Sequence, residues 1–206
     1  MHIIGLCGGS GSGKGAVCSF FSEYGIPSID ADRVYHEITS YYSPCLRELE
    51  SAFGSKIIKN ESLDRKALAE IVFSSEEKGT NLELLNTISH KYVVEEMMKR
   101  AADFEDKGKR YVIFDAPLLF EAGADKYCSF IICVIADKEV RTGRIVNRDG
   151  ITKEQAGTRI ASQRKDSVLV ERSDFVIENN GSLDDLKESV KNVIRIIKDR
   201  FGEKNG

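Results

Sequence analysis

A glycine-rich segment near the start of the chain constrains the fold more than any other part of the sequence. Gly8 is followed, after four residues, by Gly13 and Lys14. This is the spacing of the loop that cradles the phosphates of nucleoside triphosphates. The motif normally ends in Ser or Thr, whose hydroxyl binds Mg²⁺, but here Gly15 and Ala16 follow the lysine. The sequence therefore predicts a phosphate site that lacks its usual metal ligand.

The segments that flank the glycines decide between a phosphate site and a flexible turn. An apolar run at 2–7 precedes them, as in a buried parallel strand, and apolar residues recur at helical spacing over 16–24. In a strand–loop–helix unit, backbone N–H groups and the positive end of the helix converge on an anion. We therefore favour a phosphate site over a flexible turn. The predicted ATP-binding loop comprises Gly8, Gly9, Ser10, Gly11, Ser12, Gly13, Lys14, Gly15 and Ala16.

The remaining pattern alternates apolar runs with helical periodicity. Strand candidates lie at 26–30, 110–115, 128–136 and 174–178, and helix candidates at 14–24, 31–42, 44–53, 63–73, 81–106, 137–148, 152–164 and 183–200. This alternation predicts an α/β fold with a five-stranded parallel sheet flanked by helices, a P-loop NTPase of the nucleoside-monophosphate-kinase type. The second and third strands are about 80 residues apart, too far for an ordinary crossover.

The long separation suggests three regions. We expect the nucleotide-binding core at 1–34, 107–136 and 171–206, a helical substrate-binding insertion at 35–106, and a lid at 137–170, which is rich in basic residues.

Composition narrows the class of partner. With 206 residues, 41% of them hydrophobic, the chain can bury a sizeable core, and its net charge of −3 argues against nucleic-acid partners. No apolar run is long enough to span a membrane, and no basic leader precedes the first strand, so we expect no membrane partner. Five scattered cysteines form no CxxC pair, which argues against disulfide or zinc frameworks. We expect a cytoplasmic protein, either a monomer or a small homo-oligomer.

Three aspartates lie at or just after the ends of predicted strands, where ligands of open α/β sheets bind. Asp30 and Asp32 follow the second strand, and Asp115 ends the third. A carboxylate beside a transferable phosphate can accept a hydroxyl proton, and we favour Asp32 for this role. Asp115 matches the metal-binding carboxylate of phosphate-loop enzymes. The alternatives are a helix N-cap or turn residue for Asp30 and Asp32, and a turn residue for Asp115.

A stripe of arginines crosses the predicted lid. Arg141, Arg144 and Arg148 share one helical face. Such stripes are usually solvated surface, but beside a phosphate loop a clamp on polyphosphate oxygens is the better interpretation, because the guanidinium fork fits phosphate. We favour Arg144 and Arg148 for this clamp.

These segments together resemble the dephospho-CoA kinase family. The resemblance covers about residues 2–200 in the same order and at compatible spacing. It is carried by the loop 5–14, Asp30–Asp32, Leu63–Arg65 with Val72–Phe73, Asp115–Glu121 (Asp-Ala-Pro-Leu-Leu-Phe-Glu), the lid residues Arg144, Arg148, Arg159 and Gln163, and 174–181 with its Asn-Asn-Gly turn.

The resemblance implies transfer of the γ-phosphate of ATP to the ribose 3′-hydroxyl of dephospho-CoA, giving coenzyme A and ADP. It implies that Asp32 is the base, that Lys14 and the loop amides hold the phosphates, and that Arg144 and Arg148 neutralise charge. Asn179, Asn180 and Gly181 would lie near the adenine of ATP. The expected substrate-binding residues are Asp32, Leu63, Arg65, His90, Pro117, Leu118 and Glu121.

The Gly15–Ala16 departure raises the question of how Mg²⁺, the expected cofactor, is held. Our hypothesis is that ATP oxygens, waters and carboxylates such as Asp30, Asp32 or Asp115 replace the missing hydroxyl, because Mg²⁺ keeps several waters in most sites.

Two alternatives remain open from the sequence. One is another small-molecule or nucleoside-monophosphate kinase of the same fold, and the other is a nucleotide-binding module without catalysis.

Overall fold

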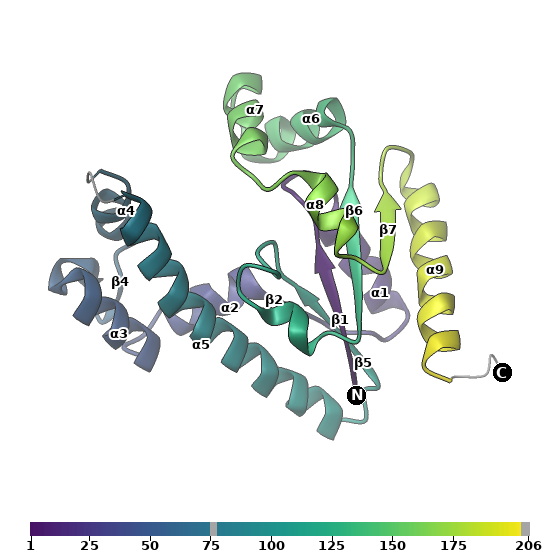
Figure 1. The fold of residues 1–206 in the computed structure, drawn as a ribbon, viewed down its shortest axis with the longest axis horizontal. Coiled ribbons are helices and arrows are strands. Elements are labelled where there is room, and N and C mark those ends of the chain that lie inside the picture. Colours follow the sequence, from purple (N-terminus) through teal and green to yellow (C-terminus); the bar gives the residue numbers. More distant parts are fainter. Residues whose placement is uncertain (75–77, 203–206) are drawn as a thin grey trace.

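A five-stranded parallel sheet forms the centre of the molecule in the computed structural model, which describes residues 1–74 and 78–202 (Figure 1). The strand order is β2-β5-β1-β6-β7, and every neighbouring pair is parallel. The strands are β1 (His2–Cys7), β2 (Ser28–Asp30), β5 (Tyr111–Asp115), β6 (Phe130–Ile135) and β7 (Phe175–Glu178). The predicted α/β fold with a five-stranded parallel sheet is confirmed.

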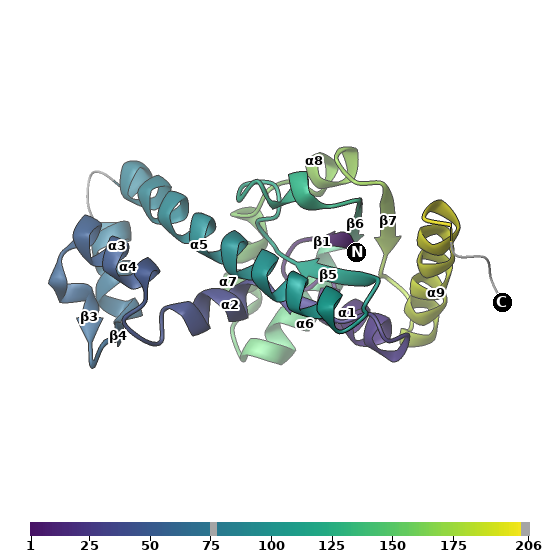
Figure 2. The ribbon, with the colours of Figure 1, turned by 90° about the horizontal axis from the view of Figure 1, so that it is seen from below.

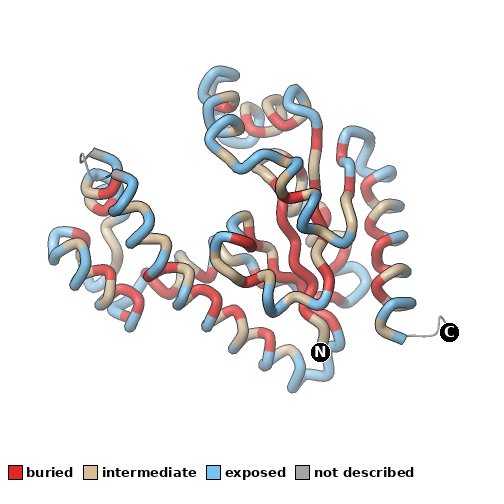
Figure 3. Tube along the Cα trace, in the orientation of Figure 1, coloured by how far each residue is buried: buried red, intermediate tan, exposed pale blue. Residues whose placement is uncertain are grey.

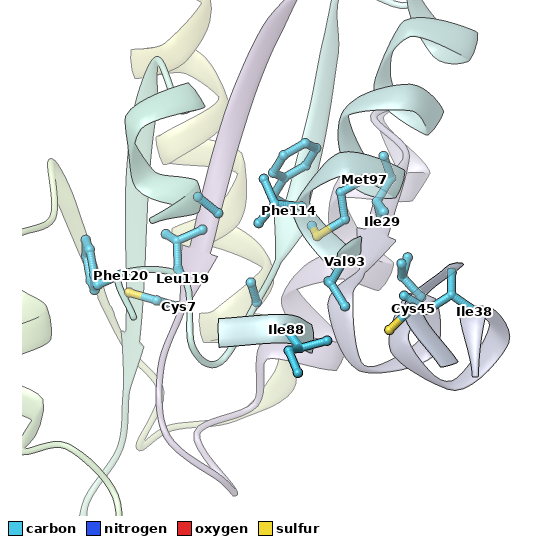
Figure 4. Close-up of a cluster of buried hydrophobic side chains, with 14 of the residues drawn as sticks. Cys7, Ile29, Ile38, Cys45, Ile88, Val93, Met97, Phe114, Leu119 and Phe120 are labelled. Carbon is cyan, nitrogen blue, oxygen red and sulfur yellow. The ribbon is translucent and has the colours of Figure 1, made fainter. Parts of the chain in front are cut away.

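Apolar side chains cover both faces of the sheet. On one face Val17 and Phe21 of α1 (Lys14–Glu23) and Val190 of α9 (Leu183–Arg200) pack on strand residues such as Ile132. The opposite face packs on α2 (Ala31–Ile38) and α5 (Lys78–Asp106), and Figure 4 shows part of this second cluster. Figure 3 shows buried positions along the central strands and the inner side of α9. The sheet is therefore packed against helices on both faces, as in other layered α/β folds.

The predicted insertion extends away from the sheet (Figure 2). It contains the second half of α2 and all of α5, together with α3 (Pro44–Phe53), the 3₁₀ turn η1 (Ser55–Ile57), the hairpin strands β3 (Ile58–Lys59) and β4 (Ser62–Leu63), and α4 (Arg65–Ser74). One part of α5 packs against α2, β2 and β5, while α3 and α4 pack on the same long helix. The long helix thus connects the outer helices to the sheet.

Local hydrogen bonds place two helix ends differently from the prediction. Helix α2 ends at Ile38 rather than near residue 42, and the Thr39 hydroxyl donates to the Tyr35 carbonyl at 2.7 Å. Helix α4 begins at Arg65 rather than at 63, because Ser62–Leu63 pairs as β4 and the next residue, Asp64, accepts backbone N–H groups of the first turn. Short two-residue strands leave little periodicity in a sequence.

The second excursion contains α6 (Lys138–Asp149), α7 (Lys153–Ala161) and α8 (Asp166–Glu171). The sequence did not predict the six-residue helix α8, nor the 3₁₀ turn η2 (Ala124–Tyr127) before β6. Helix α6 packs on α7, and α8 contacts β6. Among the described residues no helix is both long and apolar enough to cross a membrane.

Candidate functional site

The predicted phosphate loop lies between β1 and α1, at the carboxyl edge of the sheet. Gly8 has φ +143°, and a Cβ there would lie 2.3 Å from the Val134 carbonyl oxygen on β6. Gly13 has φ +103°, and a Cβ there would lie 2.1 Å from Asn179 Nδ2. Only glycine fits both positions, because each combines a left-handed backbone with a close neighbour.

Side chains from distant segments hold the loop from behind. Asn179 Nδ2 donates to the Ser12 carbonyl at 2.8 Å, and Arg144 Nη1 donates to the carbonyls of Gly11 and Ser12 at 3.3 Å each. Arg144 Nη2 also donates to Asn179 Oδ1 at 3.2 Å. These donors hold the Gly11 and Ser12 carbonyls toward Asn179 and Arg144. Negative oxygen dipoles therefore face the protein, which leaves the cavity side of the loop favourable for an anion.

The loop opens into a cavity of about 620 Å³. Its charged residues are the cations Lys14, Arg144 and Arg148 and the carboxylates Asp32 and Asp115. The complete lining is Gly9, Ser10, Gly11, Gly13, Lys14, Gly15, Ala16, Asp32, Asp115, Pro117, Leu118, Arg144, Arg148 and Gln163. The phosphate loop, both favoured arginines and the favoured base thus border one cavity, which we call the loop cavity.

Asp115 ends β5 beside the phosphate lysine. Lys14 Nζ lies 3.8 Å from Asp115 Oδ1, and Cys18 Sγ donates to Oδ2 at 3.6 Å. Burial raises the pKa of Asp115, while Lys14 opposes this rise. Oδ1 is buried and makes no hydrogen bond. A buried carboxylate oxygen without a donor is a suitable ligand for a hard cation such as Mg²⁺.

Asp30 and Asp32 have different environments although they are two residues apart. Asp30 is the N-cap of α2, and its Oδ1 accepts the backbone N–H groups of Asp32 and Arg33 at 2.9 and 3.1 Å. It is not among the residues that line the loop cavity. Asp32 does line that cavity. Burial raises the pKa of Asp32, Asp30 raises it further, and Lys14 lowers it. A raised pKa suits a carboxylate that must accept a proton.

A second cavity, of about 200 Å³, adjoins the first. Its lining is mostly apolar and comes chiefly from α2, α5 and the segment after β5. The residues are Ala31, Asp32, Tyr35, Leu85, Asn86, Ser89, His90, Val93, Val94, Met97, Ala116, Pro117, Leu118, Ala122 and Ala124. We call it the apolar cavity. Asp32, Pro117 and Leu118 line both cavities, so the carboxylate stands where the two meet.

His90 lines the apolar cavity, and its contact with substrate stays a prediction. It is half-buried, and burial lowers the pKa of its imidazole, while Glu121 opposes this change. A neutral imidazole at neutral pH can donate and accept hydrogen bonds to a bound polar group without adding charge. His90 is therefore suited to contacting an acceptor rather than to neutralising phosphate.

Three other predicted substrate residues lie outside both cavities. Leu63 and Arg65 line a separate hollow of about 450 Å³ beside the β3–β4 hairpin. Glu121 Oε1 pairs with Arg164 Nε at 2.8 Å, which joins the segment after β5 to the connection between α7 and α8. Their part in substrate binding stays a prediction.

The Asn-Asn-Gly turn lies behind the loop rather than in the cavity lining. Asn179 is buried against Ser12, and Asn180 Oδ1 accepts the backbone N–H of Asp137 at 2.7 Å. A Cβ at Gly181 would lie 2.6 Å from Asp185 Oδ2. Contact of these residues with adenine stays a prediction. Their observed contacts fix the loop and the start of α6.

Sequence reasoning missed the residues that support the loop. It grouped Arg141 with the phosphate arginines, but Arg141 is 5% exposed and does not line the loop cavity. Gln163, noted only as part of the family resemblance, does line the cavity and accepts the Ser10 backbone N–H at 2.9 Å. Because these partners are more than 100 residues from the loop in sequence, no local pattern could identify them.

The metal-binding capacity of the site is spread over single carboxylates. Within 1–74 and 78–202, no group of three or more His, Cys, Asp and Glu side chains is arranged to hold a metal ion. Asp32 and Asp115 both line the loop cavity, so Mg²⁺ there would take additional ligands from phosphate oxygens and water.

Comparisons with known proteins agree with this geometry. The family model described as dephospho-CoA kinase matches residues 2–185. A dephospho-CoA kinase from Corynebacterium glutamicum is 40% identical over 201 residues, covering 97% of this chain and 99% of that protein.

Two solved structures extend the likeness to the fold. A crystal structure of a Thermus thermophilus protein superposes with a TM-score of 0.78 at 30% identity, covering 95% of this chain and 97% of the other. A dephospho-CoA kinase from Campylobacter jejuni has a TM-score of 0.69 at 27% identity, covering 95% and 96%. Sequence, fold and site geometry lead to one conclusion: the chain belongs to the dephospho-CoA kinase family.

Proposed function

We propose that the protein transfers the γ-phosphoryl group of ATP to the 3′-hydroxyl of dephospho-CoA. The observation that carries this proposal is the meeting of the loop cavity and the apolar cavity at Asp32. A phosphate donor in one cavity and an alcohol in the other would place the reacting oxygen at the carboxylate. Family membership supports the identity of both substrates.

The chemistry follows from the groups around the meeting point. The acceptor oxygen bonds to the γ-phosphorus as its proton passes to the Asp32 carboxylate. The bond from that phosphorus to the β–γ bridging oxygen breaks, and ADP leaves. Lys14, Arg144 and Arg148 neutralise the charge that develops on the phosphate oxygens, and the loop amides fix their position.

The acceptor's orientation is limited by the position of its reacting group. If the 3′-hydroxyl lies at Asp32, its own ribose and adenine must occupy the adjoining space. The apolar cavity provides that space, with Tyr35 on one side and Val93, Val94 and Met97 of α5 on the other. Flat, weakly polar adenine suits such a lining.

The residues present fit Mg²⁺ as the cofactor. The Asp115 carboxylate, whose buried Oδ1 accepts no hydrogen bond, would hold it together with phosphate oxygens and water. Bound there, Mg²⁺ would neutralise phosphate charge. Asp30 is a weaker candidate because its Oδ1 already accepts two backbone N–H groups.

We place the reaction in the cytoplasm, where thiols stay reduced, since all five cysteines are free.

Phosphate transfer from labelled ATP to separate acceptors tests the proposal. We expect transfer to dephospho-CoA, with a new phosphate on the ribose 3′ oxygen in the ³¹P–¹H spectrum of the product. Adenosine and uridine serve as control acceptors, because they lack the diphosphate and pantetheine arm of the substrate. Transfer to either control with none to dephospho-CoA would reject the assignment, and ATP binding without transfer to any acceptor would indicate a non-catalytic module.

A further inference from the structure

A buried arginine behind the phosphate loop has no part in the contacts proposed above. Arg141 lies on α6, and its side chain is 6% exposed. Its guanidinium donates Nε to the Ser10 carbonyl at 2.9 Å, Nη2 to Gln163 Oε1 at 2.8 Å, and Nη1 to both carboxylate oxygens of Asp166 at 3.1 and 3.2 Å. A buried guanidinium costs free energy unless its N–H groups are hydrogen-bonded. The three partners of Arg141 therefore keep its side chain in this buried position.

The bond to Ser10 fixes the direction of a peptide group in the loop. In a planar trans peptide the C=O and the following N–H point in opposite directions. Arg141 holds the Ser10 C=O toward α6, so the N–H of Gly11 points away from α6. Gly11 lines the loop cavity. The arginine thus orients a backbone donor of the kind that binds phosphate.

The loop is shaped around this side chain. A Cβ at Gly9 would lie 2.1 Å from Arg141 Nη2, and a Cβ at Gly11 would lie 2.7 Å from the Arg141 carbonyl oxygen. The missing side chains at these two glycines therefore make room for Arg141. A phosphate loop needs glycines for its backbone conformation in any case. Here the Arg141 guanidinium also occupies the space that a side chain at Gly9 would fill.

The same cluster ties the loop to the end of the excursion at 138–171. Gln163 Oε1 accepts both from Arg141 and from the backbone N–H of Ser10. Asp166, the first residue of α8, fixes the other end of the guanidinium. Gln163 Oε1 therefore binds the loop and the arginine at once. Through these hydrogen bonds and the Asp166 ion pair, the cluster fixes the position of the loop relative to α6 and α8.

We propose that Arg141, held by Asp166 and Gln163, is a positioning residue for the nucleotide: it keeps the phosphate loop in the conformation that binds the β- and γ-phosphates. Arg141 acts through the Ser10 and Gly11 peptide, and the phosphates contact the loop rather than the guanidinium. This inference rests on the proposed use of the loop for ATP. It predicts a defect in nucleotide binding rather than in acceptor binding.

Titration of the full-length protein with ADP and with dephospho-CoA, each alone, tests the inference without turnover. Arg141→Met keeps the bulk of the side chain and removes its donors. We expect the Kd for ADP to rise by about tenfold or more, because the charge-assisted hydrogen bond that holds the Ser10 carbonyl is lost. The Kd for dephospho-CoA should stay within twofold. Arg200→Met is the matched control, because it removes an exposed arginine whose Nη1 pairs with Asp174 Oδ1 at 2.9 Å, away from the site.

Two further variants keep the test independent of folding. Asp166→Asn and Gln163→Ala keep Arg141 but remove one of the partners that hold its guanidinium. Each should raise the Kd for ADP by about threefold or more. The double variant Arg141→Met/Asp166→Asn should have the same Kd for ADP as Arg141→Met alone, since both substitutions act through the Arg141 side chain.

The steady-state constants separate positioning from a general loss of folded protein. A positioning role raises KM for ATP and leaves KM for dephospho-CoA unchanged, whereas a smaller folded fraction lowers kcat alone. Unchanged ADP affinity in folded Arg141→Met, or in Asp166→Asn should the first variant not fold, would overturn the inference. Equal losses of ADP and dephospho-CoA affinity would overturn it as well. If the wild type binds ADP but transfers no phosphate to dephospho-CoA, the proposed function fails while the ADP titrations still decide the role of Arg141.

Discussion

Asp32 is the residue whose substitution separates chemistry from binding most clearly. It borders both cavities, whereas the neighbouring Asp30 caps α2. Asp32→Asn keeps the shape and removes the base, so we expect kcat to fall by about 100- to 10,000-fold. The Kd for ATP, measured by titration calorimetry, should change little because Lys14 and the loop are untouched. Turnover equal to the wild type would show that Asp32 has no role in proton transfer.

The pH dependence of the reaction should report the same carboxylate. Burial and then Asp30 raise the pKa of Asp32 above its ordinary value of 3.8. A base works only when deprotonated, so kcat/KM should fall as pH drops through this raised pKa. Asp30→Asn removes the neighbouring charge and keeps an oxygen for capping. It should therefore move the acid limb of the kcat/KM profile to lower pH. An acid limb that shifts upward, or does not shift, would contradict this assignment.

Gly15 stands where phosphate loops usually carry a hydroxyl, and the structure leaves room for one. The residue is exposed, and a Cβ there would have no heavy atom within 4 Å. Gly15→Ser should fold normally and strengthen the apparent Mg²⁺ affinity only modestly, by less than about tenfold, because Mg²⁺ keeps waters and phosphate oxygens as ligands. Activity measured against Mg²⁺ concentration tests this, with Gly15→Ala as the control that adds only a methyl group. A gain in activity of several orders of magnitude would mean that the natural site lacks an essential ligand.

At the scale of elements, the junction of β1 with the loop depends on contact with β6. A Cβ at Gly8 would lie 2.3 Å from a backbone atom of Val134, which cannot move aside as a flexible side chain can. Gly8→Ala should therefore lower the free energy of unfolding by about 1–3 kcal/mol, the usual range for overpacking.

Gly157 provides the matched control for that substitution. It lies inside α7 with open space around its Cβ position, so Gly157→Ala should raise the free energy of unfolding by about 0.5–1 kcal/mol. Urea denaturation of both variants measures the difference. If Gly8→Ala proves as stable as Gly157→Ala, the close contact between Gly8 and the Val134 backbone does not limit the residue at position 8.

The elements that the sequence predicted well are those with a continuous apolar signal. The strands and α1, α3 and α9 lie where the apolar runs and helical stripes placed them. The hairpin at 58–63 and helix α8 were missed because each is too short to show a period. The hairpin also turns through Asn60 and Glu61, which have φ of 50° and 59°, and Glu is an unusual residue for that conformation.

The candidate site could be predicted from the sequence only in part. The loop, Lys14, Asp32 and Asp115 were identified because each belongs to a local pattern at a strand end. The arginine stripe was correctly placed on one helix, but its members have different surroundings: Arg141 is buried, Arg144 supports the loop, and Arg148 pairs with Asp149 at the cavity edge. The spacing of the three arginines places them on one face of α6. How deeply each one is buried depends on where that face packs against the phosphate loop, which the spacing does not show.

At the scale of the whole molecule, the sheet joins two binding regions that come from different parts of the chain. The loop cavity draws chiefly on the phosphate loop after β1, on α1 and on α6, and the apolar cavity on α2, α5 and the segment after β5. Their shared wall is short, namely Asp32, Pro117 and Leu118. Both substrates should therefore bind at the same time, with direct transfer between them and no phosphorylated form of the protein.

A compound that joins both substrates tests this arrangement for the whole molecule. Adenosine linked through its 5′-tetraphosphate to the 3′ oxygen of dephospho-CoA would span both cavities, with one phosphate more than the reacting pair. Linking two ligands turns the second binding step into an intramolecular one, so we expect a Kd at least about 100-fold lower than that of ADP or dephospho-CoA. The isomer joined at the 2′ oxygen is the control, because it misplaces the acceptor relative to Asp32. Competition against ATP and against dephospho-CoA measures both compounds. An affinity no higher than that of the tighter-binding half would mean that the two cavities are not occupied together in the way that direct transfer requires.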